Sequence, residues 1–178
     1  MRIDPVCRVL DAMAAPYALI GAHAMAARGY PRFTVDVDLL TTDPRVLEQN
    51  AWSALETAGA IVERRRGDAD DPLAGVVHIL LADTTDVDIV LARWQWESDV
   101  ISRAETLTVA EGVRIRVPRT SDLILLKLAA GGFMDLRDAA ALLEISERAA
   151  VVKEIESRIG DVRPDVRSAW RELLEGST

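Results

Sequence analysis

Two short segments of this chain alternate acidic and apolar residues, and they constrain the fold more than any other feature. Residues 35–40 read Val-Asp-Val-Asp-Leu-Leu, and residues 86–90 read Asp-Val-Asp-Ile-Val. In an extended strand alternate side chains share a face, so Asp36 and Asp38 point one way while Val35 and Val37 point the other. The pattern predicts strands that are anchored in a core and open an acidic face to a polar site.

This acidic face needs a ligand. Two carboxylates about 5 Å apart repel each other by about 3 kcal/mol at an effective dielectric of 20. Folding alone gains nothing from that repulsion. A divalent cation, which prefers hard oxygen ligands, would turn it into coordination. We therefore predict a metal site at Asp36 and Asp38.

Composition sets the class of protein. The 178 residues are 49% hydrophobic and 28% charged, which indicates a soluble globular chain of one domain, or one domain with a helical appendage. No apolar run reaches the length of a membrane span, and the first residues do not resemble a signal peptide, so we expect a cytoplasmic protein without membrane association. The single cysteine, Cys7, cannot form an internal disulfide and fits a reducing compartment.

Charge and metal-ligand counts exclude two further classes. The net charge of −8 argues against non-specific binding along DNA, where neutralisation of phosphates supplies most of the affinity. Two histidines and one cysteine argue against a zinc site.

Apolar spacing and turn residues predict an α+β order followed by helices alone. Expected strands are residues 17–20, 35–40, 60–65, 76–81, 86–90, 107–109 and 113–117. Expected helices are residues 4–15, 23–28, 42–58, 94–103, 121–130, 136–145, 149–159 and 164–174. Such an order predicts an α/β (α+β) fold with a mixed sheet and a helical C-terminal portion.

The order of motifs resembles the polymerase-β-like nucleotidyltransferase superfamily. Its signature is a Gly-Gly or Gly-Ser turn at a helix start, then a hydrophobic-Asp-hydrophobic-Asp strand, then a third strand carboxylate. The matching parts here are Ile20-Gly21-Ala22-His23-Ala24, then residues 32–38 with Asp36 and Asp38, then Asp88. Among its members, the chain looks most like the minimal bacterial branch that includes AbiEii-type toxins.

A second stretch is similar to the same branch. Residues 117–130 resemble its downstream helix with a single lysine, here Lys127, and Asp135-Leu136-Arg137-Asp138 resembles the Asp-x-x-Asp of its next helix. The similar parts span about residues 17–143. Two departures stand out: Ala22 replaces the second glycine, and Phe133 and Met134 stand where a basic residue is usual.

The resemblance implies a fold, a reaction and a set of roles. It implies a nucleotidyltransferase catalytic domain in residues 1–117, with a small, mainly antiparallel sheet, and a helical region in residues 118–178 packed on it. It implies transfer of a nucleoside monophosphate from an NTP to a hydroxyl, with Mg²⁺ or Mn²⁺ as cofactor. Two metal ions can stabilise the entering and leaving oxygens of such a displacement. The implied metal ligands and catalytic residues are Asp36, Asp38 and Asp88. The implied nucleotide-binding residues are Gly21, Ala22, Arg32, Thr34 and Lys127.

Several residues allow a second interpretation. Asp86 competes with Asp88 for the third carboxylate; we prefer Asp88 because Val87 and Ile89 flank it, and we expect Asp86 to be solvated. Lys127 is as readily a buried stem with a solvated ammonium as a phosphate ligand. Asp135 and Asp138 suit a helix start for dipole reasons alone. The histidines His23 and His78 are expected to be packing residues.

The acceptor stays open between an RNA such as a tRNA end, a protein side chain and an aminoglycoside-like small molecule. The family branch also suggests the toxin of a toxin–antitoxin system with a cognate antitoxin as partner. A different class of function is a non-catalytic binding partner that keeps the fold, such as an antitoxin or a regulatory module. The plainest alternative is a structural domain whose acidic strand faces water.

Overall fold

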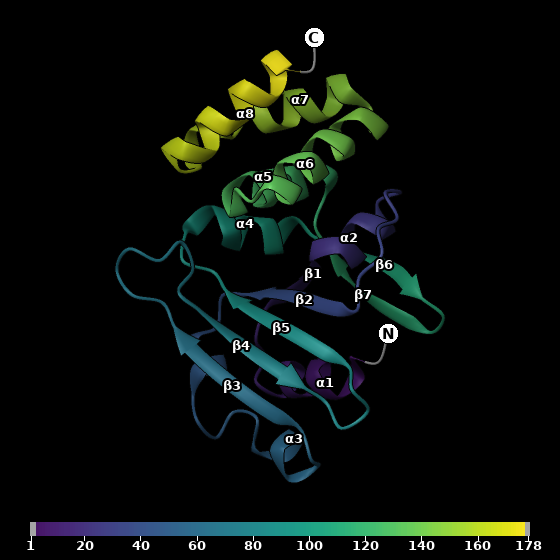
Figure 1. Cartoon of the computed structure of the whole chain (residues 1–178), viewed down its shortest axis with the longest axis vertical. Coiled ribbons are helices and arrows are strands. Elements are labelled where there is room, and N and C mark those ends of the chain that lie inside the picture. The colour runs from purple at the N-terminus through teal and green to yellow at the C-terminus, as the bar shows by residue number, and fades with distance from the viewer. Residues whose placement is uncertain (1–2, 177–178) are drawn as a thin grey trace.

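A mixed five-stranded sheet lies at the centre of the computed structural model, which describes residues 3–176. The strands run in the order β1-β2-β5-β4-β3, and only β2 and β5 are parallel. Their bounds are β1 (Tyr17–Ile20), β2 (Asp36–Thr41), β3 (Ile61–Arg66), β4 (Gly75–Leu80) and β5 (Asp86–Leu91). The expected mainly antiparallel sheet is thus confirmed (Figure 1).

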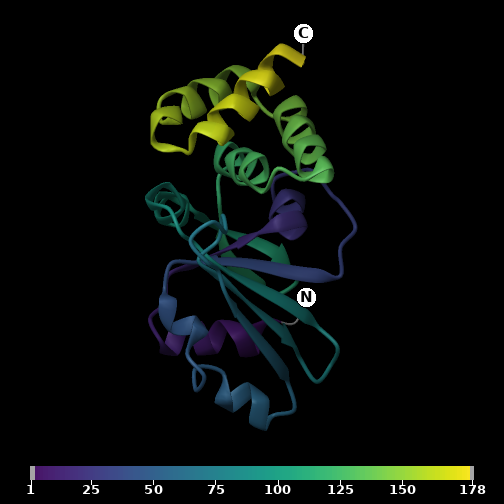
Figure 2. The ribbon, with the colours of Figure 1, turned by 60° about the vertical axis from the view of Figure 1, so that its left-hand side comes forward.

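Alternation along these strands separates a core face from a polar face. On one face Val37 and Leu39 of β2 and Val87 and Ile89 of β5 are almost fully buried, as their 2.0-residue period predicts. They join one continuous hydrophobic cluster that includes Trp52. Figures 1 and 2 show helix α1 (Asp4–Ala12) and the segment with 3₁₀ helix η1 (Pro44–Leu47) and α3 (Ser53–Thr57) on this side of the sheet.

The prediction of one continuous helix over residues 42–58 is wrong, because the middle of this segment is not helical. It is divided into η1 and the short helix α3. Trp52 explains the break: its side chain is fully buried and its Nε1 donates a hydrogen bond to the Val46 carbonyl at 2.8 Å. The chain folds back after η1 so that this indole is buried and reaches the Val46 carbonyl. A continuous helix would place Trp52 too far along the chain direction for its side chain to make this contact.

The other elements flank the sheet or extend it toward the C-terminus. Helix α2 (Gly21–Ala27) follows β1, and α4 (Gln95–Arg103) follows β5. A two-stranded sheet, β6 (Glu105–Ala110) with β7 (Val113–Val117), lies beside β1. The C-terminal helices are α5 (Thr120–Ala130), α6 (Phe133–Ile145), α7 (Arg148–Glu156), 3₁₀ helix η2 (Ile159–Asp161) and α8 (Pro164–Gly176).

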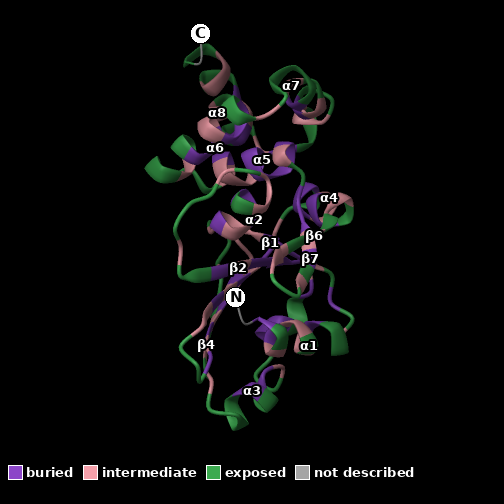
Figure 3. Cartoon of the chain, turned by 90° about the vertical axis from the view of Figure 1, so that its right-hand side faces the viewer, coloured by how far each residue is buried: buried purple, intermediate pink, exposed green. Residues whose placement is uncertain are grey.

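Helix α5 is the central helix of this C-terminal group and packs against α2, α6, α7 and α8. It is buried along much of its length (Figure 3). The fully buried Asp122 of α5 accepts hydrogen bonds from Arg103 of α4 at 2.8 Å and from Arg158 at 3.0 Å. This network fixes the helical group on the sheet half. Between residues 3 and 176, none of the helices is both long enough and apolar enough to cross a membrane.

Candidate active site

Four carboxylates lie on one face of the sheet, where β2 runs parallel to β5. Asp36 is the Cα partner of Asp86, and Asp38 is the Cα partner of Asp88. Residues opposite each other in neighbouring strands point to the same face, so the four side chains leave the sheet together. The structure therefore brings Asp88 to the face of Asp36 and Asp38, as a shared cation requires.

Asp38 carries the clearest electrostatic signature of a cation site. Burial, and next the charge of Asp88, raise the pKa of Asp38 from 3.8 to about 6; Asp36 adds to this, while Lys127 and Arg32 oppose it. A carboxyl group with this pKa is destabilised when ionised, because it is surrounded by like charge and partly shielded from water. A divalent cation at this position would reverse both effects, so these residues fit such an ion.

Gly21 begins α2 directly beside Asp38. The pairing of β1 with β2 places Ile20 opposite Asp38, and the chain then turns at Gly21 with φ of +65°. A Cβ on Gly21 would lie 1.9 Å from Oδ2 of Asp38. Glycine is needed here both for its backbone conformation and for its lack of a side chain. The methyl group of Ala22, the departure from the family signature, is buried at 5% exposure.

Two cations reach this site from outside the sheet, Arg32 from the segment before β2 and Lys127 from α5. Both are bound by acids of α6. The Nη1 atom of Arg32 lies 2.6 Å from Oδ2 of Asp138, and Nζ of Lys127 lies 3.1 Å from the same oxygen and 2.7 Å from Oδ1 of Asp135. Asp138 is only 2% exposed. The helical portion therefore folds over the carboxylates and brings Lys127, Asp135 and Asp138 to the site.

Thr34 and His23 have local surroundings of their own. Thr34 Oγ1 accepts a hydrogen bond from the Asp36 backbone N–H at 3.3 Å, at the start of β2. This side chain closes the turn that leads into the acidic strand. His23 lies in α2, where burial lowers its pKa.

His78 of β4 is the residue that the sequence interpretation missed. Its Nδ1 lies 2.9 Å from Oδ1 of Asp88 and 3.2 Å from Oδ1 of Asp86. Within the described chain, these three residues form the group of potential ligand atoms that all lie within 4.8 Å of one another. Imidazole nitrogen and carboxylate oxygen are both common ligands of divalent metals.

Asp86 is not the freely solvated residue that we expected. Its Oδ1 is buried and makes no hydrogen bond to any described residue. Burial raises the pKa of Asp86, while His78 lowers it. Sequence alternation alone signals that His78 shares a face with Val76 and Leu80, but only the order of the strands reveals that this face adjoins the acids.

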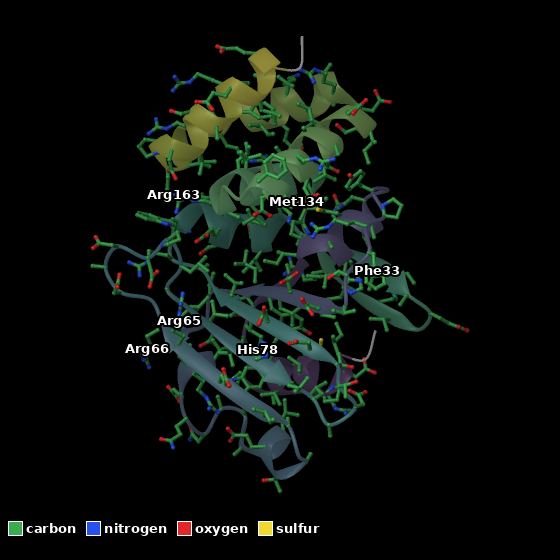
Figure 4. All side chains as sticks on the ribbon, in the orientation of Figure 1. Phe33, Arg65, Arg66, His78, Met134 and Arg163 are labelled. Atoms are coloured by element: carbon green, nitrogen blue, oxygen red, sulfur yellow. The ribbon has the colours of Figure 1, made fainter. Side chains whose placement is uncertain are left out.

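Two adjacent cavities lie where the helical portion meets the sheet half, and none of the four site carboxylates lines either of them. The smaller, of about 290 Å³, is lined by Leu40 and Val90, each two residues beyond a site acid on the same strand face. The larger, of about 700 Å³, shares Pro72, Ala129, Ala130 and Arg163 with it. In Figure 4, Arg163 lies where the helices meet the sheet half and His78 lies on the sheet below them.

The larger cavity is apolar but carries a net negative charge. Helices α5, α6 and α8 provide Leu128, Leu136 and Leu173. Its charged lining residues, counted among those described, are Asp70, Asp71, Asp165, Glu172 and the single cation Arg163. Arg163 is itself paired with Asp165 at 2.8 Å. A bound molecule would therefore meet apolar walls and unneutralised acids.

No protein-family model and no curated protein matches this chain. Solved structures do match it. The antibiotic-resistance factor ANT(2'')-Ia in solution is 18% identical, with a TM-score of 0.54 over 98% of this chain and 91% of that one. The crystal structure of ANT(2'')-Ia with adenylyl-2''-tobramycin is 19% identical, with a TM-score of 0.53 over 88% and 96%. The lincosamide antibiotic adenylyltransferase LnuA, bound to lincomycin, is 13% identical, with a TM-score of 0.50 over 79% and 94%.

The fold of these neighbours is the fold that the acidic strands of this chain predict. They are antibiotic adenylyltransferases of the nucleotidyltransferase superfamily, and the similarity spans both the sheet and the helical portion. The narrower resemblance to the AbiEii-type branch stays a prediction, because no family model matches. The sheet, its acidic face and the helices that cover it give this chain a nucleotidyltransferase-like fold.

Proposed function

We propose that this chain transfers a nucleoside monophosphate from an NTP to a hydroxyl group of a small molecule, with release of pyrophosphate. The observation that carries the proposal is the register of β2 and β5, which puts Asp36, Asp38 and Asp88 on one face beneath Lys127 and Arg32. The names of the structural neighbours, which are adenylyltransferases, support the same reaction and make ATP the first nucleotide to test.

The roles follow from charge and position. Asp36, Asp38 and Asp88 would hold Mg²⁺ or Mn²⁺, which when bound supplies charge stabilisation for the triphosphate and the attacking oxygen. Arg32 and Lys127 would bind phosphate oxygens, and Gly21 and Ala22 would offer backbone N–H groups beside them. Thr34, at the start of β2, would fix the approach of the triphosphate.

The chemical step needs a proton acceptor, which this chain can supply. Asp88 accepts the proton of the acceptor hydroxyl, and that oxygen forms a bond to the α-phosphorus. The bond between the α-phosphorus and the oxygen that bridges to the β-phosphorus breaks, and pyrophosphate leaves. Because NTPs are abundant in the cytosol, we expect the protein to act there.

As the proposed acceptor pocket, the larger cavity would favour one class of acceptor. A volume of about 700 Å³ is within the range of drug-sized ligand pockets. Its acids disfavour a polyanion such as a tRNA end, whose binding depends on cationic contacts. They favour an amine-bearing molecule with an apolar or sugar-like body. A toxin that modifies RNA, and a chain with a cognate antitoxin, therefore have less support than an enzyme for small molecules.

Calorimetry and labelling test the proposal together. We expect ATP to bind in the presence of Mg²⁺ or Mn²⁺, and Asp38→Asn to weaken that binding at least 10-fold. Glu144→Gln is the matched control because Glu144 is an exposed acid of α6. Tobramycin, lincomycin, total tRNA and total protein would then be offered with each α-phosphate-labelled NTP.

The labelled acceptor distinguishes the competing functions. Label on tobramycin or lincomycin supports a small acceptor, and label on tRNA or protein overturns that part alone. Metal-dependent NTP binding without transfer to any of these probes would favour the non-catalytic binding partner. If no NTP binds with metal present, the proposed function is wrong.

A further inference from the structure

His78 and Asp88 form a side-chain pair across two antiparallel strands. In the pairing of β4 with β5, His78 is the Cα partner of Asp88, so both side chains leave the same face at the closest lateral spacing of the sheet. Nδ1 of His78 lies 2.9 Å from Oδ1 of Asp88, which is hydrogen-bond distance. His78 belongs to β4, whereas the other residues proposed for the reaction come from the segment before β2, from β2 and β5, from the start of α2 and from α5.

The direction of this hydrogen bond follows from the chemistry of the two groups. An ionised carboxylate has no hydrogen to donate, so Nδ1 of His78 must carry the hydrogen and donate it to Oδ1 of Asp88. The Oδ1 atom of Asp86 lies 3.2 Å from the same nitrogen but has no hydrogen bond within the described chain. One N–H donor can serve one of the two acids well, and the shorter distance indicates that it serves Asp88.

We propose that His78 is a positioning residue for Asp88: its Nδ1–H holds Oδ1 and thereby fixes the carboxylate plane, so that Oδ2 meets the acceptor hydroxyl and the metal. This inference rests on the proposed function. The need for such a restraint comes from the surroundings. Asp88 is 39% exposed, and Asp36, Asp38 and Asp86 repel it from the same face. A short side chain under that repulsion would otherwise turn toward solvent.

Two substitutions separate the hydrogen bond from the ring. In His78→Asn the amide Nδ2 occupies nearly the position of the imidazole Nδ1, so the donor is kept and the ring is lost. In His78→Phe the ring is kept and the donor is lost. Val76→Thr is the matched control, because Val76 points to the same face of β4 two residues away and pairs with Val90 instead of an acid.

The experiment measures single-turnover transfer from labelled ATP to whichever probe acceptor the wild-type protein labels. We expect His78→Phe to lower the rate about 10-fold to 100-fold, as loss of a group that orients a metal-ligating side chain does. His78→Asn should stay within about threefold of wild type, and Val76→Thr should be unchanged. With Mn²⁺ at saturating concentration, the Kd of ATP should change less than twofold in all three, because His78 contacts Asp88, the proposed proton acceptor, and none of the residues proposed to bind phosphate. A merely structural role would instead move stability and every kinetic constant together.

Mn²⁺ titration followed by electron paramagnetic resonance gives a readout that needs no acceptor. We expect the Mn²⁺ affinity to fall about 10-fold in His78→Phe and to be retained in His78→Asn. If both variants lose Mn²⁺ affinity equally, His78 is itself a metal ligand and the positioning role is wrong. If neither variant changes transfer or Mn²⁺ affinity, the role is also wrong. A wild-type protein that binds Mn²⁺ but transfers nothing would refute the proposed reaction while the Mn²⁺ comparison still decides the part played by His78.

Discussion

At the scale of single residues, the ionised carboxylate of Asp38 opposes folding but favours the binding of a cation. Asp38 lies beside Gly21, which leaves room for its carboxylate, and burial together with the charges of Asp88 and Asp36 raises its pKa to about 6. The same environment that destabilises the bare carboxylate makes it a strong ligand for a cation. Stability and metal binding should therefore respond in opposite directions when Asp38 is changed.

Replacing Asp38 with Asn should stabilise the metal-free protein above pH 7. The pKa of Asp38 in the folded state lies above 3.8, so the folded state binds this proton more tightly, and wild-type stability falls as pH rises from about 4 to about 6. Asn never ionises, so the variant should be more stable by about 1–2 kcal/mol at pH 8 and close to wild type below pH 4. Urea unfolding with EDTA at several pH values measures this. Saturating Mn²⁺ should remove the advantage.

Gly21→Ala should disrupt the protein more than an ordinary glycine substitution. The new Cβ would approach Oδ2 of Asp38 to 1.9 Å, whereas Gly112, at φ of +72°, has no described atom within 4 Å of the equivalent position. Gly112→Ala therefore reports the cost of the backbone conformation alone, about 1–2 kcal/mol. We expect Gly21→Ala to cost about 2 kcal/mol more, because packed atoms must shift. Equal values in thermal unfolding would contradict the close contact.

The acids of the site were predictable from sequence because a strand's period is short and local. Asp36, Asp38 and Asp88 share a face through alternation and one assumed strand pairing. His78 was not predictable in the same way as a neighbour of Asp86 and Asp88. Their contact depends on β4 lying beside β5 and on the register between them, which no local pattern encodes.

At the scale of elements, the contact between α6 and the segment before β2 links the two halves of the site. Asp138 of α6 joins Arg32 and Lys127 through one carboxylate, and Lys127 also contacts Asp135. A triphosphate would compete with these acids for both cations. Nucleotide binding and the position of α6 should therefore be coupled.

Asp138→Ala should destabilise the protein, because it leaves Arg32 and Lys127 without their buried partner. We expect a loss of about 3 kcal/mol, as for the removal of one member of a buried ion pair. Asp165→Ala breaks an exposed pair with Arg163 and should change stability by less than about 1 kcal/mol. Denaturant unfolding gives the free energy of unfolding of both variants. Similar losses of stability would show that the buried Asp138 network stabilises the protein no more than the exposed pair does.

Element boundaries were recovered well except where a tertiary contact overrode local propensity. The expected helix over residues 42–58 fits its sequence pattern, yet burial of Trp52 divides it. The helical C-terminal region was predictable from its periodicity. Its placement over the carboxylates was not, because it depends on long-range pairs such as Arg32 with Asp138.

At the scale of the whole molecule, one hydrophobic cluster runs through both the sheet half and the helical portion. The boundary between residues 117 and 118, which the sequence predicts as a domain limit, is bridged by Arg28. Its side chain donates hydrogen bonds to the carbonyls of Val117 at 3.0 Å and Pro118 at 2.8 Å. The two parts should therefore unfold as one cooperative unit.

Calorimetry provides the measurement. We expect a single transition for the full chain, with the calorimetric and van't Hoff enthalpies equal. Asp122→Ala, which removes the buried acid between Arg103 and Arg158, should lower the midpoint and keep a single transition. Two resolved transitions in the wild-type chain would show that residues 118–178 fold separately.

The outer position of β3 in the strand order has a consequence for the molecule in concentrated solution. A free sheet edge offers unpaired backbone groups to which a second chain can add a strand. Arg64, Arg65 and Arg66 lie on this edge strand, and Arg65 and Arg66 are exposed. A neighbouring molecule that approached the edge would have to desolvate these guanidinium groups, so the arginine run should guard the protein against self-association and fibre formation.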